Sequence, residues 1–144
     1  LFLLVRPIQQ QKDAAIMGQF HRSVLIQNVS KNRLEWKNLG QRIPLSSVNT
    51  LKTDEWQLLE LHRDAQNNLK CLINGMDVTV GEPEDSLPFV FMFLFNNNKG
   101  QEFAKQDPFA GDIAALVAYR DALTEDERAK VRLYFTVVYG LQGQ

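Results

Sequence analysis

With 144 residues, the chain has the size of a single domain, residues 1–144, and is long enough to bury a core of its own. Its formal net charge of -1 excludes the strong positive field that draws proteins to nucleic acids or anionic membranes, and its single cysteine, Cys71, excludes an intrachain disulfide. The apolar run "LFLLV" is too short to cross a bilayer, so we expect neither nucleic-acid binding nor membrane insertion. Because the sequence begins at Leu1 without a methionine and already inside a strand-like run, we expect a fragment of a longer protein.

The first half of the chain consists of short β-type runs separated by turn residues. The runs are "LFLLVRP" (1–7), "AAIMGQF" (14–20), "HRSVLIQNV" (21–29), "NRLEWKN" (32–38) and "EWQLLELHRD" (55–64). In the fourth run, the alternation of polar and apolar residues places Leu34 and Trp36 on one face. The fifth alternates in the same way and ends at the turn sequence "DAQNN".

A hairpin is predicted next, where "LKCLI" (69–73) and "MDVTV" (76–80) flank Asn74 and Gly75. Asn-Gly favours a type I′ turn, the tight turn whose twist matches that of antiparallel strands. Cys71 alternates with apolar neighbours here and is interpreted as a small buried hydrophobic residue. Farther on, the continuous apolar run "PFVFMFLF" (88–95) predicts a strand buried on both faces, and "NNNKG" (96–100) predicts a loop.

The last segment combines a strand, "GDIAALVAY" (111–119), with a helix from Thr124 to Tyr139. Thr124 is a suitable N-cap, and Glu127 stands three residues later, which is the spacing of a capping box. Gly140 suits the left-handed position at which helices end. Many strands and one late helix exclude a fold of repeated strand-helix-strand units, so we predict an all-β, two-sheet antiparallel β-sandwich with one C-terminal helix.

Three separate segments of the chain resemble one family. "TDEWQLLELHRDAQNNLKCLINGMDV" (53–78) is similar to the central hairpin of the concanavalin A-like lectin/glucanase superfamily, in particular its laminin-G-like jelly-roll domains. "PFAGDIAALVAYRDALTEDERAKVRLYFTVVYGL" (108–141) is similar to the final segment of bacterial and viral members, and "LFLLVRP" resembles an early strand. The resemblance implies two sheets in jelly-roll order, with Trp56, Phe109 and Tyr119 as framework residues and the helix across one edge or end.

That family also contains glycoside hydrolases, which use a pair of carboxylates on one strand. The nearest pattern in this chain is Glu60-x-His62-x-Asp64, which period-2 alternation places on one sheet face. The family signature has glutamates at both ends and an aspartate between them, and this sequence departs from it at two of the three positions. We therefore expect no enzyme activity and no catalytic residue, a solvated polar face at this strand, and a turn position for Asp64.

Calcium and sugar sites are the remaining possibilities. Many laminin-G-like domains bind Ca²⁺ through loop aspartates, and Asp64, Asp77, Asp107 and Asp112 are possible ligands, although no three of them cluster in sequence. Sugar recognition needs an aromatic platform beside amides or hydroxyls. The candidate ligand-binding residues are Trp36, Asn28, Asn32, Asn38, Asn96, Asn97 and Asn98. The alternative is that Trp36 belongs to the core and that the asparagines only form turns.

The functional hypothesis is a non-catalytic carbohydrate- or surface-binding module of a larger secreted, cell-surface or phage-virion protein. Its partners would be a glycan or another cell-surface ligand, together with neighbouring domains or subunits. The alternative is a structural or assembly module, for example in a phage tail or capsid surface, that contacts only its neighbours. The family resemblance favours the binding module because most of that family binds glycans or proteins without catalysis.

Overall fold

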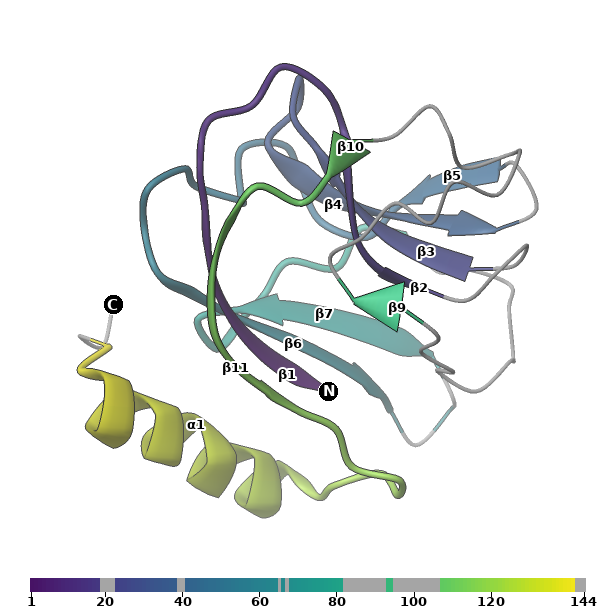
Figure 1. Ribbon diagram of the computed structural model, residues 1–144. Coiled ribbons are helices and arrows are strands. Elements are labelled where there is room, and N and C mark those ends of the chain that lie inside the picture. The colour runs from purple at the N-terminus through teal and green to yellow at the C-terminus, as the bar shows by residue number, and fades with distance from the viewer. Residues whose placement is uncertain are drawn as a thin grey trace.

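In the computed structural model, two β-sheets face each other and a helix covers the outer side of one of them (Figure 1). The structure describes residues 1–18, 23–38, 41–64, 66, 68–81, 93–94 and 107–141. Most of the run "PFVFMFLF" and the whole of "NNNKG" lie outside these residues. Within the described part of the chain, no helix combines the length and the apolar character that a bilayer crossing requires.

The first sheet has five strands in the order β11-β1-β6-β7-β8. Its strands are β1 (Phe2–Pro7), β6 (Gln57–Arg63), β7 (Leu69–Ile73), β8 (Met76–Asp77) and β11 (Gly111–Val117). All neighbours are antiparallel, and β1 lies between β11 and β6, with Leu3 opposite Leu59. The first strand of the chain, β1, therefore pairs with the last strand, β11. An ion pair between Arg6 and Asp112, which are 106 residues apart in the sequence, joins these two strands.

The second sheet has the order β10-β2-β3-β4-β5, and β9 also pairs with β2. Its strands are β2 (Ala14–Gly18), β3 (Ser23–Asn28), β4 (Arg33–Asn38), β5 (Gln41–Pro44), β9 (Phe93–Leu94) and β10 (Asp107–Pro108). The neighbouring strands from β2 to β5 pair antiparallel, whereas the two-residue strand β10 runs parallel to β2. The two antiparallel sheets and the C-terminal helix confirm the predicted fold class.

The main core lies between the sheets and follows from strand alternation. Leu3 and Val5 of β1 and Leu59 and Leu61 of β6 point into it from the first sheet. The second sheet contributes side chains that include Ile16, Met17, Leu25, Leu34 and Trp36. Phe109 also lies in this core, whereas Trp56 and Tyr119 are partly exposed, so only one of the three expected framework residues is buried.

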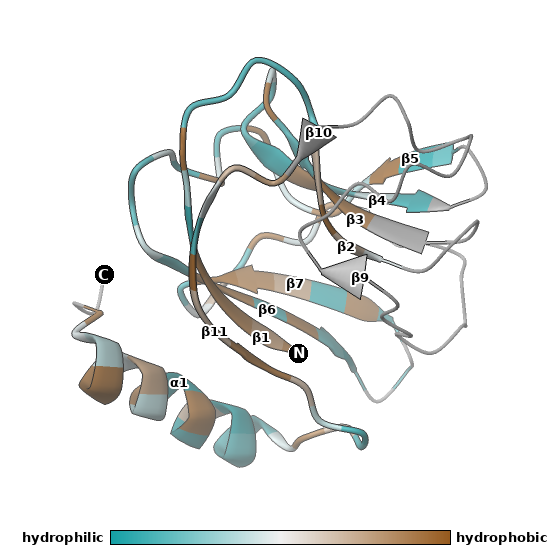
Figure 2. Cartoon of the chain, viewed as in Figure 1, coloured by the Kyte–Doolittle hydropathy of each residue, from teal (hydrophilic) through white to brown (hydrophobic). Residues whose placement is uncertain are grey.

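A second, smaller core lies between the first sheet and helix α1 (Glu125–Tyr139). The residues of β1 and β6 that alternate with the first set, Phe2, Leu4 and Leu58, contact Phe135 of the helix. β1 therefore carries apolar residues on both faces, and Figure 2 shows hydrophobic residues along β1 and β11 and on the helix. The helix covers a face of the sheet, so the expected position across an edge or an end is wrong. The reason is that Phe2, Leu4 and Leu58 must be shielded from water.

The predicted turn and caps are confirmed. Asn74 and Gly75 both have positive φ, 51° and 81°, as a type I′ turn requires. Thr124 and Glu127 form the reciprocal hydrogen bonds of a capping box at the start of α1. At the end of the helix, Gly140 has the left-handed φ of 64°.

Candidate functional site

Of the sequence-predicted sugar-binding residues whose side chains the structure describes, Trp36 and Asn28 are buried and only Asn32 is exposed. Trp36 is 7% exposed and packs in the core between the sheets. The buried Asn28 donates from Nδ2 to Glu35 Oε1 at 2.8 Å, and its Oδ1 accepts from the hydroxyl of Ser30 and the N–H of Lys31. Asn28 therefore organises the turn between β3 and β4.

The other members of the set are exposed or lie beyond the described residues. Asn32 is exposed in the β3–β4 turn with a φ of 46°. Asn38 ends β4, but its side chain is not among those that the structure describes, and Asn96, Asn97 and Asn98 lie outside the described residues altogether. Sugar binding by this set stays a prediction.

Strand β6, in which the Glu60-x-His62-x-Asp64 pattern begins, carries a buried charge. The prediction of a solvated polar face at this strand is therefore wrong. Glu60 is 1% exposed because α1 covers it. Its Oε2 accepts from Nη1 of Arg132 at 2.7 Å, and its Oε1 lies 3.2 Å from Nε of Arg128 and 3.2 Å from Nδ1 of His62. The two arginines also pair with Glu125 at the start of the helix.

These contacts decide the protonation state of Glu60. Burial by itself would raise the pKa of this carboxyl, but the contacts with His62 and Arg132 outweigh that effect and hold its pKa below the usual value. Glu60 is therefore a charged anchor for the helix at neutral pH. Asp64, as expected, belongs to a turn, where its Oδ1 accepts from the backbone N–H groups of Gln66 and Asn68 at 2.9 Å each.

The aspartates that were considered as calcium ligands lie apart. Asp112 forms an ion pair with Arg6, Asp64 shapes its turn, and Asp77 accepts from the backbone N–H of Thr79. The side chain of Asp107 lies outside those that the structure describes. Among the described residues, no three histidine, cysteine, aspartate or glutamate side chains are grouped closely enough to hold a metal ion.

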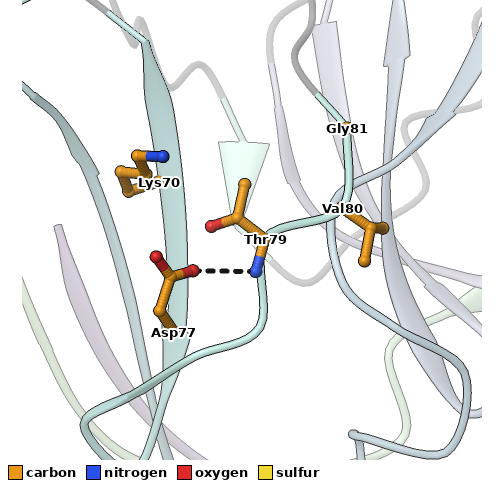
Figure 3. Close-up of a pocket in the computed structure, with 5 residues that line it drawn as sticks. All are labelled: Lys70, Asp77, Thr79, Val80 and Gly81. Carbon is orange, nitrogen blue, oxygen red and sulfur yellow. Dashed lines mark hydrogen bonds between the residues drawn. The ribbon is translucent and has the colours of Figure 1, made fainter.

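Polar groups do converge at the β7–β8 hairpin, where an open pocket of about 480 Å³ is lined by Lys70, Asp77, Thr79, Val80 and Gly81. Figure 3 shows Lys70 and Asp77 next to each other, with Thr79 beside Asp77. The hairpin produces this arrangement. Asp77 lies opposite Leu72, and alternation puts Lys70 and Leu72 on the same face of β7.

The segment after β8 closes one side of this pocket. The Thr79 hydroxyl accepts from the N–H of Cys71 at 2.9 Å, and the N–H of Val80 donates to the carbonyl of Leu45 at 3.1 Å. The chain therefore passes from the first sheet to the segment that follows β5. Gly81 is required here, because an added Cβ would lie 2.4 Å from the carbonyl oxygen of Pro44.

The pocket is lined by one positively charged side chain, Lys70, and one negatively charged side chain, Asp77. The hydroxyl and the backbone N–H of Thr79, with Lys70 nearby, lower the pKa of Asp77 and keep it ionised. One oxygen of Asp77 accepts from the N–H of Thr79 at 2.9 Å, and the second oxygen points away from that bond, to the side on which Lys70 lies (Figure 3). A carboxylate and an ammonium group can hydrogen-bond a ligand that carries hydroxyl groups. From the sequence, Asp77 was predicted only as a possible calcium ligand, although the Asn-Gly turn and strand alternation together place it near Lys70.

No protein-family model and no curated protein matches the chain. A solved structure of a candidate carbohydrate-binding protein from Bacteroides ovatus is similar to it, with a TM-score of 0.58 and 18% sequence identity. The match covers 87% of this chain and 38% of that protein. This likeness shows the fold. The chain thus spans well under half the length of the protein that it resembles.

Proposed function

We propose that the protein is a non-catalytic, carbohydrate-binding module of the concanavalin A-like, laminin-G-like type, and that the pocket at Lys70, Asp77 and Thr79 binds the sugar. The observation that carries this proposal is the presence of a carboxylate and an ammonium group in the lining of one open pocket of about 480 Å³, a volume suited to one or two sugar rings. The likeness in fold to a candidate carbohydrate-binding protein supports it.

The chemistry of the pocket suits a polyhydroxylated ligand. The free oxygen of Asp77 can accept from a sugar hydroxyl, while Lys70 can donate to the oxygen of a neighbouring hydroxyl. Two adjacent hydroxyl groups on a sugar ring could therefore bind at the same time, one as a donor to Asp77 and the other as an acceptor from Lys70. Hydrogen bonds to charged groups contribute about 1.5–3 kcal/mol each, which is enough for weak, specific binding.

Binding without catalysis is supported by the roles of the carboxylates on β6. Glu60 is enclosed by Arg128, Arg132 and His62, so it cannot reach a glycosidic bond. Asp64 is occupied by two backbone N–H groups of its turn. A function outside the cell, in a larger secreted, cell-surface or virion protein, would suit such a module and remains a proposal.

The test is a glycan array followed by calorimetry on the glycans that bind, with and without EDTA. Asp77→Asn and Lys70→Met each remove one charge while keeping the size of the side chain. Each should lower the affinity about tenfold or more, since about 1.4 kcal/mol corresponds to a factor of ten. Asp121→Asn and Lys31→Met, which change exposed residues outside the pocket lining, are the matched controls and should bind as the unaltered protein does.

The outcomes separate the parts of the proposal. If no glycan binds, the function is wrong. If glycans bind but both pocket variants leave the affinity unchanged, the pocket is not the site. In that case Asn32→Gly, which is compatible with the positive φ at this position, tests whether binding uses the asparagines predicted from sequence instead.

A further inference from the structure

The outer face of α1 exposes an unusual number of large apolar side chains. Leu133 is 61% exposed, Tyr134 55%, Val137 73% and Val138 53%. Helical spacing places them in two adjacent rows, with Ala129, Leu133 and Val137 in one and Tyr134 and Val138 in the other. We call these five residues the outer stripe. Phe135 points the opposite way and is buried against the sheet.

A helix that lies on a sheet normally presents polar residues to solvent. The first turn of α1 follows this rule with Glu125, Asp126 and Glu127, but the last two turns are apolar on both the inner and the outer face. Hydrophobic residues gather at this end of the helix in Figure 2. Contiguous apolar patches of this kind on a protein surface mark contact sites for other macromolecules.

We propose that the outer stripe is a self-association surface, through which two copies of the protein pair by packing their α1 helices antiparallel about a twofold axis. This pairing goes beyond the glycan-binding function and does not depend on it. A twofold contact places the same patch on both copies, so one apolar stripe covers the other. The rows at spacing of four residues are the ridges that helices use when they interlock.

The size of the stripe fits a dimer. An aromatic side chain such as Tyr134 has about 150–250 Å² of surface to bury, so half of it leaves on the order of 100 Å². Leu133, Val137 and Val138 are smaller but more than half exposed, and each leaves a similar area, on the order of 100 Å². Four of them give roughly 400 Å² per copy, and therefore about 800 Å² of apolar surface in a pair. With the polar residues at the rim, this reaches the roughly 1,000 Å² that a specific interface needs.

The charges of the helix favour the antiparallel direction. The last turn of α1 has no basic residue to compensate its unpaired carbonyl groups. When Leu133 of one copy lies against Val137 of the other, the pair is symmetric about residue 135. Lys130 of each copy then lies beside residue 140 of the other, where the helix ends at Gly140. Each copy thus supplies the cation that the other lacks.

The test is sedimentation equilibrium of the protein from low to high micromolar concentration. We expect a monomer–dimer equilibrium whose Kd rises about tenfold or more in Val137→Glu and in Leu133→Glu, because each dimer carries two substitutions at its centre. Val48→Glu is the matched control, since Val48 is an exposed apolar residue away from the helix, and it should leave the Kd unchanged. Far-UV circular dichroism of each variant checks that the fold is kept.

Lys130→Glu tests the direction of packing. It should raise the Kd roughly threefold to tenfold, because it places an anion beside the negative end of the partner helix. A monomer at every concentration would overturn the proposal, as would a dimer that Val137→Glu and Leu133→Glu leave intact. A dimer broken by Val137→Glu but unaffected by Lys130→Glu would overturn the antiparallel arrangement.

Discussion

Replacing Glu60 by glutamine removes the charge that joins helix α1 to the five-stranded sheet while keeping the shape of the side chain. The carboxylate is 1% exposed and contacts Arg132 at 2.7 Å and Arg128 at 3.2 Å. Removing one partner of a buried ion pair typically costs about 3–5 kcal/mol. Because both arginines keep a contact with the more exposed Glu125, we expect a loss at the low end of this range, about 3 kcal/mol of unfolding free energy.

Urea unfolding followed by circular dichroism measures this loss, with an unchanged m-value showing that the same surface is exposed on unfolding. Glu125→Gln is the control, since Glu125 contacts the same two arginines but its side chain is 63% exposed. It should cost less than about 1 kcal/mol. If Glu60→Gln cost no more than Glu125→Gln, the buried carboxylate would not be what holds the helix to the sheet.

The stabilisation that Glu60 provides should also depend on pH. The pKa of Glu60 in the folded protein lies below its usual value of about 4.3. The carboxylate therefore stabilises the fold fully above that pH, and its contribution is lost as the pH falls through the folded pKa. The difference in stability between the unaltered protein and Glu60→Gln should be constant near neutrality and shrink below about pH 4.3. A constant difference at all pH values would contradict this reasoning.

Two further predictions concern local features. Thr124→Ala removes the N-cap of α1 and should lower the unfolding free energy by about 1 kcal/mol. Thr124→Ser keeps the hydroxyl and should lower the unfolding free energy much less. Equal losses in the two variants would rule out the capping role. Burial raises the pKa of the Cys71 thiol to about 12. A thiol reagent at pH 8 should therefore label Cys71 only as fast as the protein unfolds. Rapid labelling of the folded protein would contradict the burial of Cys71.

Features that depend on a few neighbouring residues could be predicted from the amino-acid sequence. Asn74 and Gly75 specify their turn because both tolerate positive φ, and Thr124 with Glu127 specifies the start of α1 through hydrogen bonds three residues apart. Alternation along β4 and β6 likewise indicated strands, because it depends only on the period of the backbone. Two sheets and a terminal helix could therefore be predicted.

Contacts between residues that are far apart in the sequence could not be predicted in this way. Glu60 meets Arg132 across 72 residues, and nothing near either residue in the sequence shows that a helix will bury that strand face. Trp36 could stack on a sugar or fill the core, and the packing of the second sheet put it in the core. Lys70 and Asp77 form a pocket only because the hairpin, Thr79 and the segment after β5 meet there. Contacts between distant segments depend on how whole surfaces fit together, and local patterns do not encode that fit.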